Sequence, residues 1–219
     1  LSDRLKRQGK LPLTEVIRVA TEAAWGLAAA HERGLVHRDI KPDNIWLEAP
    51  NGRVKILDFG LARGEEDTGL THSGTVLGTP RYMSPEQTEG GSIDHRTDLF
   101  SLGSVLYHTA TGQAPFQGTS LASTLVAVAR ANPRPITSLR EDLPASVARL
   151  ITSLLKRNPD KRPQTAQQVA EQFAAQQQFP EPHLKFAPKP TTEATKGQST
   201  STLSPHKSST SLFSHYRSI

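Results

Sequence analysis

The sequence predicts a mainly α-helical fold with one short β-hairpin and a disordered C-terminal tail. Three observations favour this fold class. Apolar residues recur at helical spacing in several segments, an Asn-Gly pair separates two short apolar runs, and the composition changes after Phe179. We therefore expect a folded region over residues 1–178 and a tail over residues 179–219.

A long amphipathic helix is predicted over residues 13–31. Its apolar stripe is formed by Leu13, Val16, Ile17, Ala20, Ala24, Leu27, Ala28 and His31. Gly34 follows this stripe and is well placed to end the helix. The helix leads the chain directly into His37.

Two short strands are predicted over residues 45–47 and 54–57, with Asn51-Gly52 as the turn between them. The hairpin carries Asn44 at one end and Asp58 at the other. Because paired strands lie side by side, both side chains can face one small volume.

Residues 60–84 are rich in Gly, Thr and Ser and lack periodicity, which predicts a long functional loop. The segment over residues 98–111 is apolar on most sides and is expected to form a central core helix. Further helices are predicted over residues 121–131, 145–156 and 165–176, the last with a capping box between Thr165 and Gln168. Residues 179–219 are dominated by Pro, Ser, Thr and Lys, which predicts disorder.

The composition excludes several classes of protein. Cysteine is absent, which excludes disulfides and thiolate zinc sites. No apolar run approaches the roughly 18 residues of a membrane span, and no signal peptide is visible, so we expect a cytoplasmic protein. The net charge is +5, but the basic residues are scattered without an aromatic platform, so we expect no nucleic-acid partner. The chain opens on Leu1 and not on Met, and we expect a fragment.

Three oxygen-bearing side chains are the candidates for chemistry: Asp39, Asn44 and Asp58. A carboxylate close to an attacking hydroxyl can orient it and accept its proton, which is the role expected for Asp39. Mg²⁺ prefers hard oxygen ligands and usually takes only one or two from protein, so Asn44 and Asp58 are its candidate ligands. Lys41 lies two residues after Asp39, and in an extended loop its ammonium could neutralise charge on a moving phosphoryl group. The alternatives are ordinary turn residues and a surface lysine.

Arg38 has two interpretations that the sequence does not separate. Its guanidinium could hold a phosphorylated residue of the loop, or it could form a structural salt bridge with a loop acid. The candidate phosphorylation sites are Thr71, Ser73 and Thr75. Thr79 is instead expected to form a hydrogen bond with the loop that contains Asp39.

Five other residues are assigned structural roles. Glu86 and Arg162 could form a buried ion pair, since a buried carboxylate needs a partner. Asp98 could cap its helix, but we favour a role in binding backbone amides of the loop that contains Asp39. His37 itself is expected to pack structurally, and His31 is interpreted as a satisfied core residue.

The ordered run His37-Arg38-Asp39-Ile40-Lys41-Pro42-Asp43-Asn44, followed by Asp58-Phe59-Gly60, resembles the eukaryotic-like serine/threonine protein kinases, including their bacterial branch. The resemblance covers residues 1–178 and implies the large, C-terminal lobe of that fold. It implies ATP and Mg²⁺ as cofactors and a protein substrate with a Ser or Thr acceptor. Within the family, Asp39 matches the catalytic aspartate, Lys41 the lysine typical of Ser/Thr enzymes, and Asn44 and Asp58 the magnesium ligands.

The same resemblance implies further roles. Glu86 and Arg162 match a structural ion pair, and Asp98 matches the anchor of the catalytic loop. Residues 78–82 resemble a strip on which substrate docks. Trp46 stands where an apolar residue commonly forms the floor under adenine, so its indole could stack on the base or crowd it. Lys41, Asn44, Trp46 and Asp58 are thus the expected ATP-binding residues.

One departure from the family pattern is large. The Gly-rich phosphate cover, the strand lysine with its helix glutamate, and the adenine-binding hinge are not in this sequence. We expect a small N-terminal lobe to be required for nucleotide binding, and the isolated chain to have no appreciable kinase activity. Two alternatives stay open: a non-catalytic, pseudokinase-like interaction module and a small-molecule phosphotransferase of related fold. The sequence upstream of Leu1 would test the first, and a phosphoacceptor screen the second.

Overall fold

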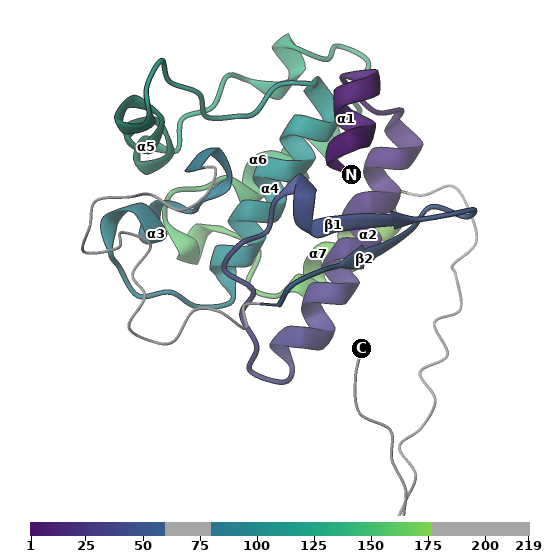
Figure 1. Ribbon diagram of the computed structural model, residues 1–219, viewed down its shortest axis with the longest axis horizontal. Coiled ribbons are helices and arrows are strands. Elements are labelled where there is room, and N and C mark those ends of the chain that lie inside the picture. Colours follow the sequence, from purple (N-terminus) through teal and green to yellow (C-terminus); the bar gives the residue numbers. More distant parts are fainter. Residues whose placement is uncertain (60–79, 177–219) are drawn as a thin grey trace, which may run out of the picture. The chain divides into compact units, whose positions relative to one another are not determined.

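The computed structural model describes residues 1–59 and 80–176, which are mainly helical with one two-stranded antiparallel sheet (Figure 1). This confirms the predicted fold class. The predicted tail lies outside the described residues, and so do five candidate site residues: Gly60, Thr71, Ser73, Thr75 and Thr79. Within the described ranges, no helix combines the length and the apolar character that crossing a membrane requires.

The core surrounds helix α4 (Arg96–Thr111), whose residues are buried on nearly all sides, as its apolar sequence predicts. It packs against α2 (Leu13–His31) and α6 (Ala145–Leu154). Gly103 permits the close approach to α6, because a Cβ atom there would lie 2.6 Å from the Cβ of Leu154. The helix begins two residues earlier than predicted, so Asp98 lies within its first turn and is not its N-cap.

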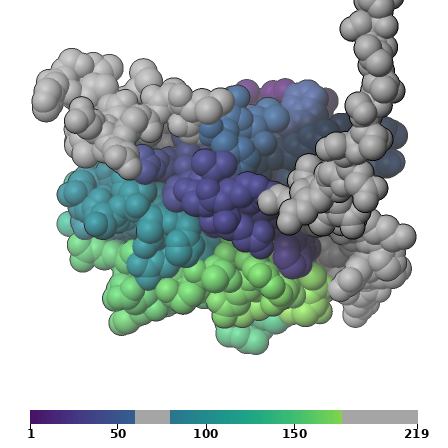
Figure 2. All heavy atoms as spheres, turned by 90° about the horizontal axis from the view of Figure 1, so that it is seen from below, coloured from purple at the N-terminus to yellow at the C-terminus, as the bar shows by residue number. Residues whose placement is uncertain are grey.

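Helix α7 (Ala166–Ala174) packs along α2, and Figure 2 shows the two as adjacent bands, α2 in purple and α7 in green. The predicted capping box at its start is only half formed. Thr165 accepts a bond from the backbone N–H of Gln168, but the side chain of Gln168 accepts from the N–H of Gln164 and not from that of Thr165.

The hairpin consists of β1 (Ile45–Glu48) and β2 (Arg53–Ile56), with Ile45 opposite Ile56 and Glu48 opposite Arg53. Each strand lies within one residue of its predicted bounds. The hairpin lies across α2 (Figure 1), where a carboxylate oxygen of Glu22 accepts from the backbone N–H of Val54 at 2.7 Å. This contact fixes the hairpin on the helical body.

Two helices were missed by the sequence analysis: α1 (Ser2–Gln8) and α3 (Pro85–Glu89). Helices of one or two turns are too short to show a clear apolar period. Helix α5 (Leu121–Arg130) was predicted, and α6 ends two residues before its predicted end. Short 3₁₀ turns occupy Pro42–Asn44, Pro80–Tyr82, Ile136–Ser138 and Pro159–Lys161.

Candidate active site

The catalytic loop, residues 37–44, is held at its start by one fully buried carboxylate of α4. Asp98 accepts hydrogen bonds from the backbone N–H groups of His37 and Arg38, each at 2.8 Å. Its third partner is the Nε2 atom of His31, also at 2.8 Å. A buried carboxylate is costly unless donors satisfy it, so these contacts fix the loop against the core. Among the described residues, the buried Nδ1 atom of His31 has no hydrogen-bond partner, so the interpretation of His31 as a satisfied core residue holds for only one of its two ring nitrogens.

His37 joins this loop to the segment that follows β2. Its Nδ1 atom accepts from the N–H of Asp39 at 3.2 Å, which leaves the proton on Nε2. Nε2 then donates to the carbonyl oxygen of Leu57 at 2.7 Å. The imidazole also lies edge-on to the ring of Phe59, with centroids 5.0 Å apart. The buried His37 therefore sets the spacing between the two halves of the motif.

Three predicted side chains meet within the loop. The Oδ2 atom of Asp39 accepts from Lys41 Nζ at 2.7 Å and from Asn44 Nδ2 at 3.1 Å. The same amide nitrogen of Asn44 donates to the backbone carbonyl of Asp39 at 2.8 Å. The oxygen of the Asn44 amide is thereby left for another ligand. The carboxylate of Asp39 is 43% exposed, so a substrate can reach it.

Asp58 follows β2 and lies next to the same loop. The N–H of Leu57 donates to the carbonyl of Asn44 at 2.9 Å, which holds the backbone beside Asp58 against the loop. Asp58 is exposed and has a φ of +54°, and Arg38 has a φ of +65°. Such left-handed conformations cost non-glycine residues energy and are concentrated at functional sites.

The residues present fit a magnesium ion that is shared with phosphate. Among the described residues, no three His, Cys, Asp or Glu side chains gather into a metal cage. Magnesium needs no such cage, because phosphate oxygens and water complete its coordination. One amide oxygen from Asn44 and one carboxylate from Asp58 are a sufficient protein contribution.

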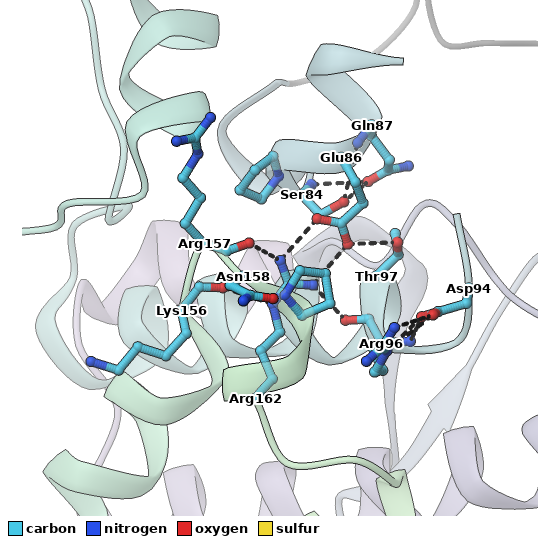
Figure 3. A network of polar contacts seen from close by, with 12 residues as sticks. Ser84, Glu86, Gln87, Asp94, Arg96, Thr97, Lys156, Arg157, Asn158 and Arg162 are labelled. Carbon is cyan, nitrogen blue, oxygen red and sulfur yellow. Dashed lines mark hydrogen bonds and ion pairs between the residues drawn. The ribbon is translucent and has the colours of Figure 1, made fainter. Parts of the chain in front are cut away.

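A buried ion pair lies below the start of α3, as Figure 3 shows. Arg162 is 3% exposed and donates to both carboxylate oxygens of Glu86, at 2.7 and 2.8 Å. It also donates to the backbone carbonyls of Arg96, Lys156 and Arg157. Burial raises the pKa of Glu86, but the hydrogen bonds and charge of Arg162, with the hydroxyl of Thr97, outweigh it and hold that pKa below its ordinary value.

Helix α3 connects this ion pair to the catalytic loop. Ser84 and Gln87 form a capping box at its start. The amide of Gln87 also donates to the carbonyl of Arg38 at 2.7 Å, one residue before Asp39. The sequence analysis missed Gln87, although the Ser-x-x-Gln pattern of Ser84 and Gln87 was a usable signal.

A second missed contact joins the Pro80–Tyr82 turn to α4. The hydroxyl of Tyr82 lies 2.7 Å from Nδ1 of His108, and the two rings stack. Burial raises the pKa of Tyr82 to about 12, and burial, with a smaller effect of the Arg81 charge, lowers the pKa of His108. His108 has no motif around it, so only the fold identifies this pair.

Two other candidates have fewer contacts in the described residues. Trp46 is 55% exposed on β1. The guanidinium of Arg38 forms no ion pair with any described residue, and the loop acids that could pair with it lie among residues 60–79. The two interpretations of Arg38 therefore stay open.

Comparisons with known proteins agree with this geometry. The family model described as "Protein kinase domain" matches residues 1–174. The chain belongs to the protein kinase family. It is 39% identical over 171 residues to the serine/threonine-protein kinase PknB of Mycobacterium tuberculosis, a match that covers 77% of this chain. It is 40% identical over 172 residues to the serine/threonine-protein kinase pkn3 of Myxococcus xanthus, a match that covers 74% of this chain. It is 38% identical over 169 residues to a probable serine/threonine-protein kinase of Clostridium perfringens, a match that covers 77% of this chain.

The matches identify the serine/threonine branch of the family, as the motif predicted. They cover only part of each relative: 27% of PknB, 31% of pkn3 and 24% of the clostridial protein. The chain thus spans about a quarter to a third of the length of these curated relatives.

Proposed function

We propose that this chain supplies the substrate-binding and metal-binding half of a serine/threonine protein kinase site. The observation that supports it most directly is the convergence of Lys41 and Asn44 on one carboxylate oxygen of Asp39. That carboxylate is anchored through the loop to buried Asp98, yet it is open to solvent.

In this proposal, Asp39 orients the hydroxyl of a substrate Ser or Thr and takes its proton as the oxygen bonds to the γ-phosphorus of ATP. The bond between that phosphorus and the bridging oxygen breaks, and ADP leaves. Lys41 is near enough to Asp39 to bring positive charge to the transferring group. Asn44 and Asp58 hold Mg²⁺, which neutralises phosphate charge. ATP and magnesium as cofactors are part of this proposal.

The protein substrate is proposed to lie against the turn Pro80–Tyr82 and helix α5. The turn packs on both α4 and α5, and Tyr82 is held by His108. Through Gln87, the adjoining helix α3 contacts the catalytic loop. A peptide on this surface would therefore pass close to Asp39. The cytoplasmic location expected from the sequence stays a prediction.

The test is transfer of the γ-phosphoryl group to a Ser/Thr peptide by the protein that contains this chain. Asp39→Asn should lower kcat by about 10²- to 10⁴-fold, since general-base catalysis is worth that much. Glu141→Gln removes the same charge from an exposed residue that has no assigned role and should leave kcat unchanged. Undiminished transfer by the Asp39→Asn variant would overturn the proposal.

We further predict that residues 1–219 alone turn over ATP too slowly to measure. They include no Gly-rich loop and no strand lysine to clamp the phosphates, and such clamping supplies most of the acceleration in this chemistry. Robust ATP turnover by the isolated chain would refute this part of the proposal without affecting the roles of Asp39 and Asn44.

A further inference from the structure

A charged cavity is lined by residues of α1, of the first half of α2, and of the hairpin with its turn. Its volume is about 430 Å³. Three arginines line it, Arg4, Arg7 and Arg18, and Trp46 and Pro50 contribute apolar surface. No residue of the catalytic loop lines this cavity, and Trp46 is the one expected ATP-binding residue in its wall.

Two of the arginines share a single carboxylate. Glu15 accepts from Arg4 at 3.1 Å and lies 3.8 Å from Arg18. Glu15 is nearly buried, whereas the two arginine side chains are about one-third exposed. The Nε atom of Arg4 is buried and has no hydrogen-bond partner among the residues that the structure describes. Each guanidinium carries five donor hydrogens, so one carboxylate leaves much of their bonding capacity unused.

Arg18 is positioned in advance by the hairpin turn. Its Nη1 atom donates to the carbonyl of Asn51 at 2.8 Å. A Cβ atom on Gly52 would lie only 2.7 and 2.8 Å from the two terminal nitrogens of Arg18. The absence of a side chain at Gly52 therefore makes room for this guanidinium beside the turn. A ligand would find the cation already in place.

The cavity wall carries three arginines and three acids, and it has an excess of positive charge only together with the two nearby lysines that pair with two of these acids. Glu15 balances one of the three arginines. The other acids in its wall, Asp3 and Glu48, are paired with Lys6 and Lys55, which do not line it. Arg7 is exposed and forms no ion pair among the described residues. The excess of two positive charges matches the charge of a phosphate monoester near neutral pH, about −1.5 to −2.

We propose that this cavity binds the phosphate group of a phosphorylated serine or threonine in a peptide. Guanidinium groups bind phosphate oxygens through paired hydrogen bonds, which a point charge cannot do. Trp46 and Pro50 give the neighbouring peptide atoms an apolar contact. The proposed kinase reaction would produce such groups, but the binding site does not depend on that reaction.

Binding is measured with the 219-residue chain in the absence of ATP and Mg²⁺, so its failure would leave the proposed catalysis untouched. The probe is a fluorescently labelled phosphoserine peptide, compared with the same peptide carrying serine, by fluorescence anisotropy. The phosphorylated peptide should bind at least roughly tenfold more tightly, because charge-assisted hydrogen bonds are worth that much. Equal binding of the two peptides would overturn the proposal.

Three variants locate the site. Arg18→Gln should weaken binding roughly tenfold. Arg7→Gln should weaken it about two- to fivefold, as expected for an exposed charge, and it breaks no ion pair that the described residues form. Arg149→Gln, on the exposed face of α6 and outside the cavity wall, is the matched control and should bind like the wild type. If both cavity variants bind as the control does, the phosphate lies elsewhere and the proposal is wrong.

Competition with inorganic phosphate shows whether the cavity binds free phosphate or the phosphate group of a peptide. It should displace the labelled peptide only at much higher concentration than the unlabelled phosphopeptide does. If both compete equally, the cavity recognises free phosphate, and the peptide part of the proposal fails.

Discussion

The catalytic loop and the Glu86–Arg162 pair are both charged clusters, but they differ in how completely their groups are satisfied. Arg162 has no exposed side-chain surface and bonds both carboxylate oxygens and three backbone carbonyls. Asp39 is 43% exposed, and Asn44 keeps its amide oxygen for another ligand. The buried cluster holds the structure together, whereas the exposed one has bonding capacity left, as the proposed function requires.

The largest expected effect comes from breaking the buried cluster. Arg162→Ala should destabilise the chain by about 3–5 kcal/mol, because it leaves Glu86 buried without a counter-charge. Arg157→Ala removes a largely exposed partner of Glu89 and should cost no more than about 1 kcal/mol. Urea unfolding followed by circular dichroism measures both, and similar losses would mean that burial does not separate the two pairs.

A smaller loss of stability is expected at Asp98, where the catalytic loop meets the core. Asp98→Asn puts an N–H₂ group where the loop amides need an acceptor, so stability should fall by about 1–3 kcal/mol. Kinase activity of the protein that contains the chain should fall with it. Asp94→Asn changes a more exposed acid near the same helix end and should cost less than about 1 kcal/mol. The contrast is lost if the two variants unfold at the same urea concentration.

Stability should fall at acidic pH partly because Glu86 becomes protonated. Its pKa is lower in the folded chain than its ordinary value of 4.5, so the unfolded chain takes up the proton first as pH falls. The contribution of ionised Glu86 to the free energy of unfolding is therefore complete above about pH 4.5. It is lost as pH falls through the pKa of Glu86 in the folded chain. Stability measured from pH 7 to pH 3 should show this loss in the wild type and in Glu141→Gln, but not in Glu86→Gln. An unchanged profile in Glu86→Gln would contradict the assignment.

The smallest effect on stability is expected at Asp39, the proposed catalytic residue. Asp39→Asn should change the free energy of unfolding by no more than about 0.5 kcal/mol, because the side chain is half exposed and its partners can turn to water. Combined with a large loss of kcat, this would mark a residue of function and not of fold. A loss of several kcal/mol would place Asp39 with the buried cluster instead.

The sequence predicted the longer elements well because each has many turns of consistent apolar pattern. Helix α2 spans the predicted apolar stripe but ends at His31, before the expected stop at Gly34, and the hairpin was located by Asn51-Gly52. Helices α1 and α3 were missed because a few residues cannot show a period, and their stability comes from tertiary contacts. In α1, for example, Leu5 is the one buried residue, so no apolar stripe is visible in its sequence.

The candidate site was predictable where residues are close in sequence, or where the family pattern names a distant partner, as for Arg162 with Glu86 and for Asp98 with the catalytic loop. Asp39, Lys41 and Asn44 fall within six positions, so one loop brings them together. The contacts of Gln87 with Arg38 and of Tyr82 with His108 span 49 and 26 positions, and no local pattern specifies them. The arginine cavity was missed for the same reason, since the hairpin turn meets Arg18 across 33 positions.

Arg162 also has a consequence for the order in which the chain is made. Glu86 is synthesised 76 residues before the arginine that neutralises it. We therefore expect a ribosome-bound chain that has not yet reached residue 162 to hold α3 loosely, although its loop from 37 to 44 is already complete. Limited proteolysis of stalled nascent chains should show cleavage near residues 84–90 until the arginine has left the exit tunnel. Protection at an earlier length would show that the helix assembles without its distant partner.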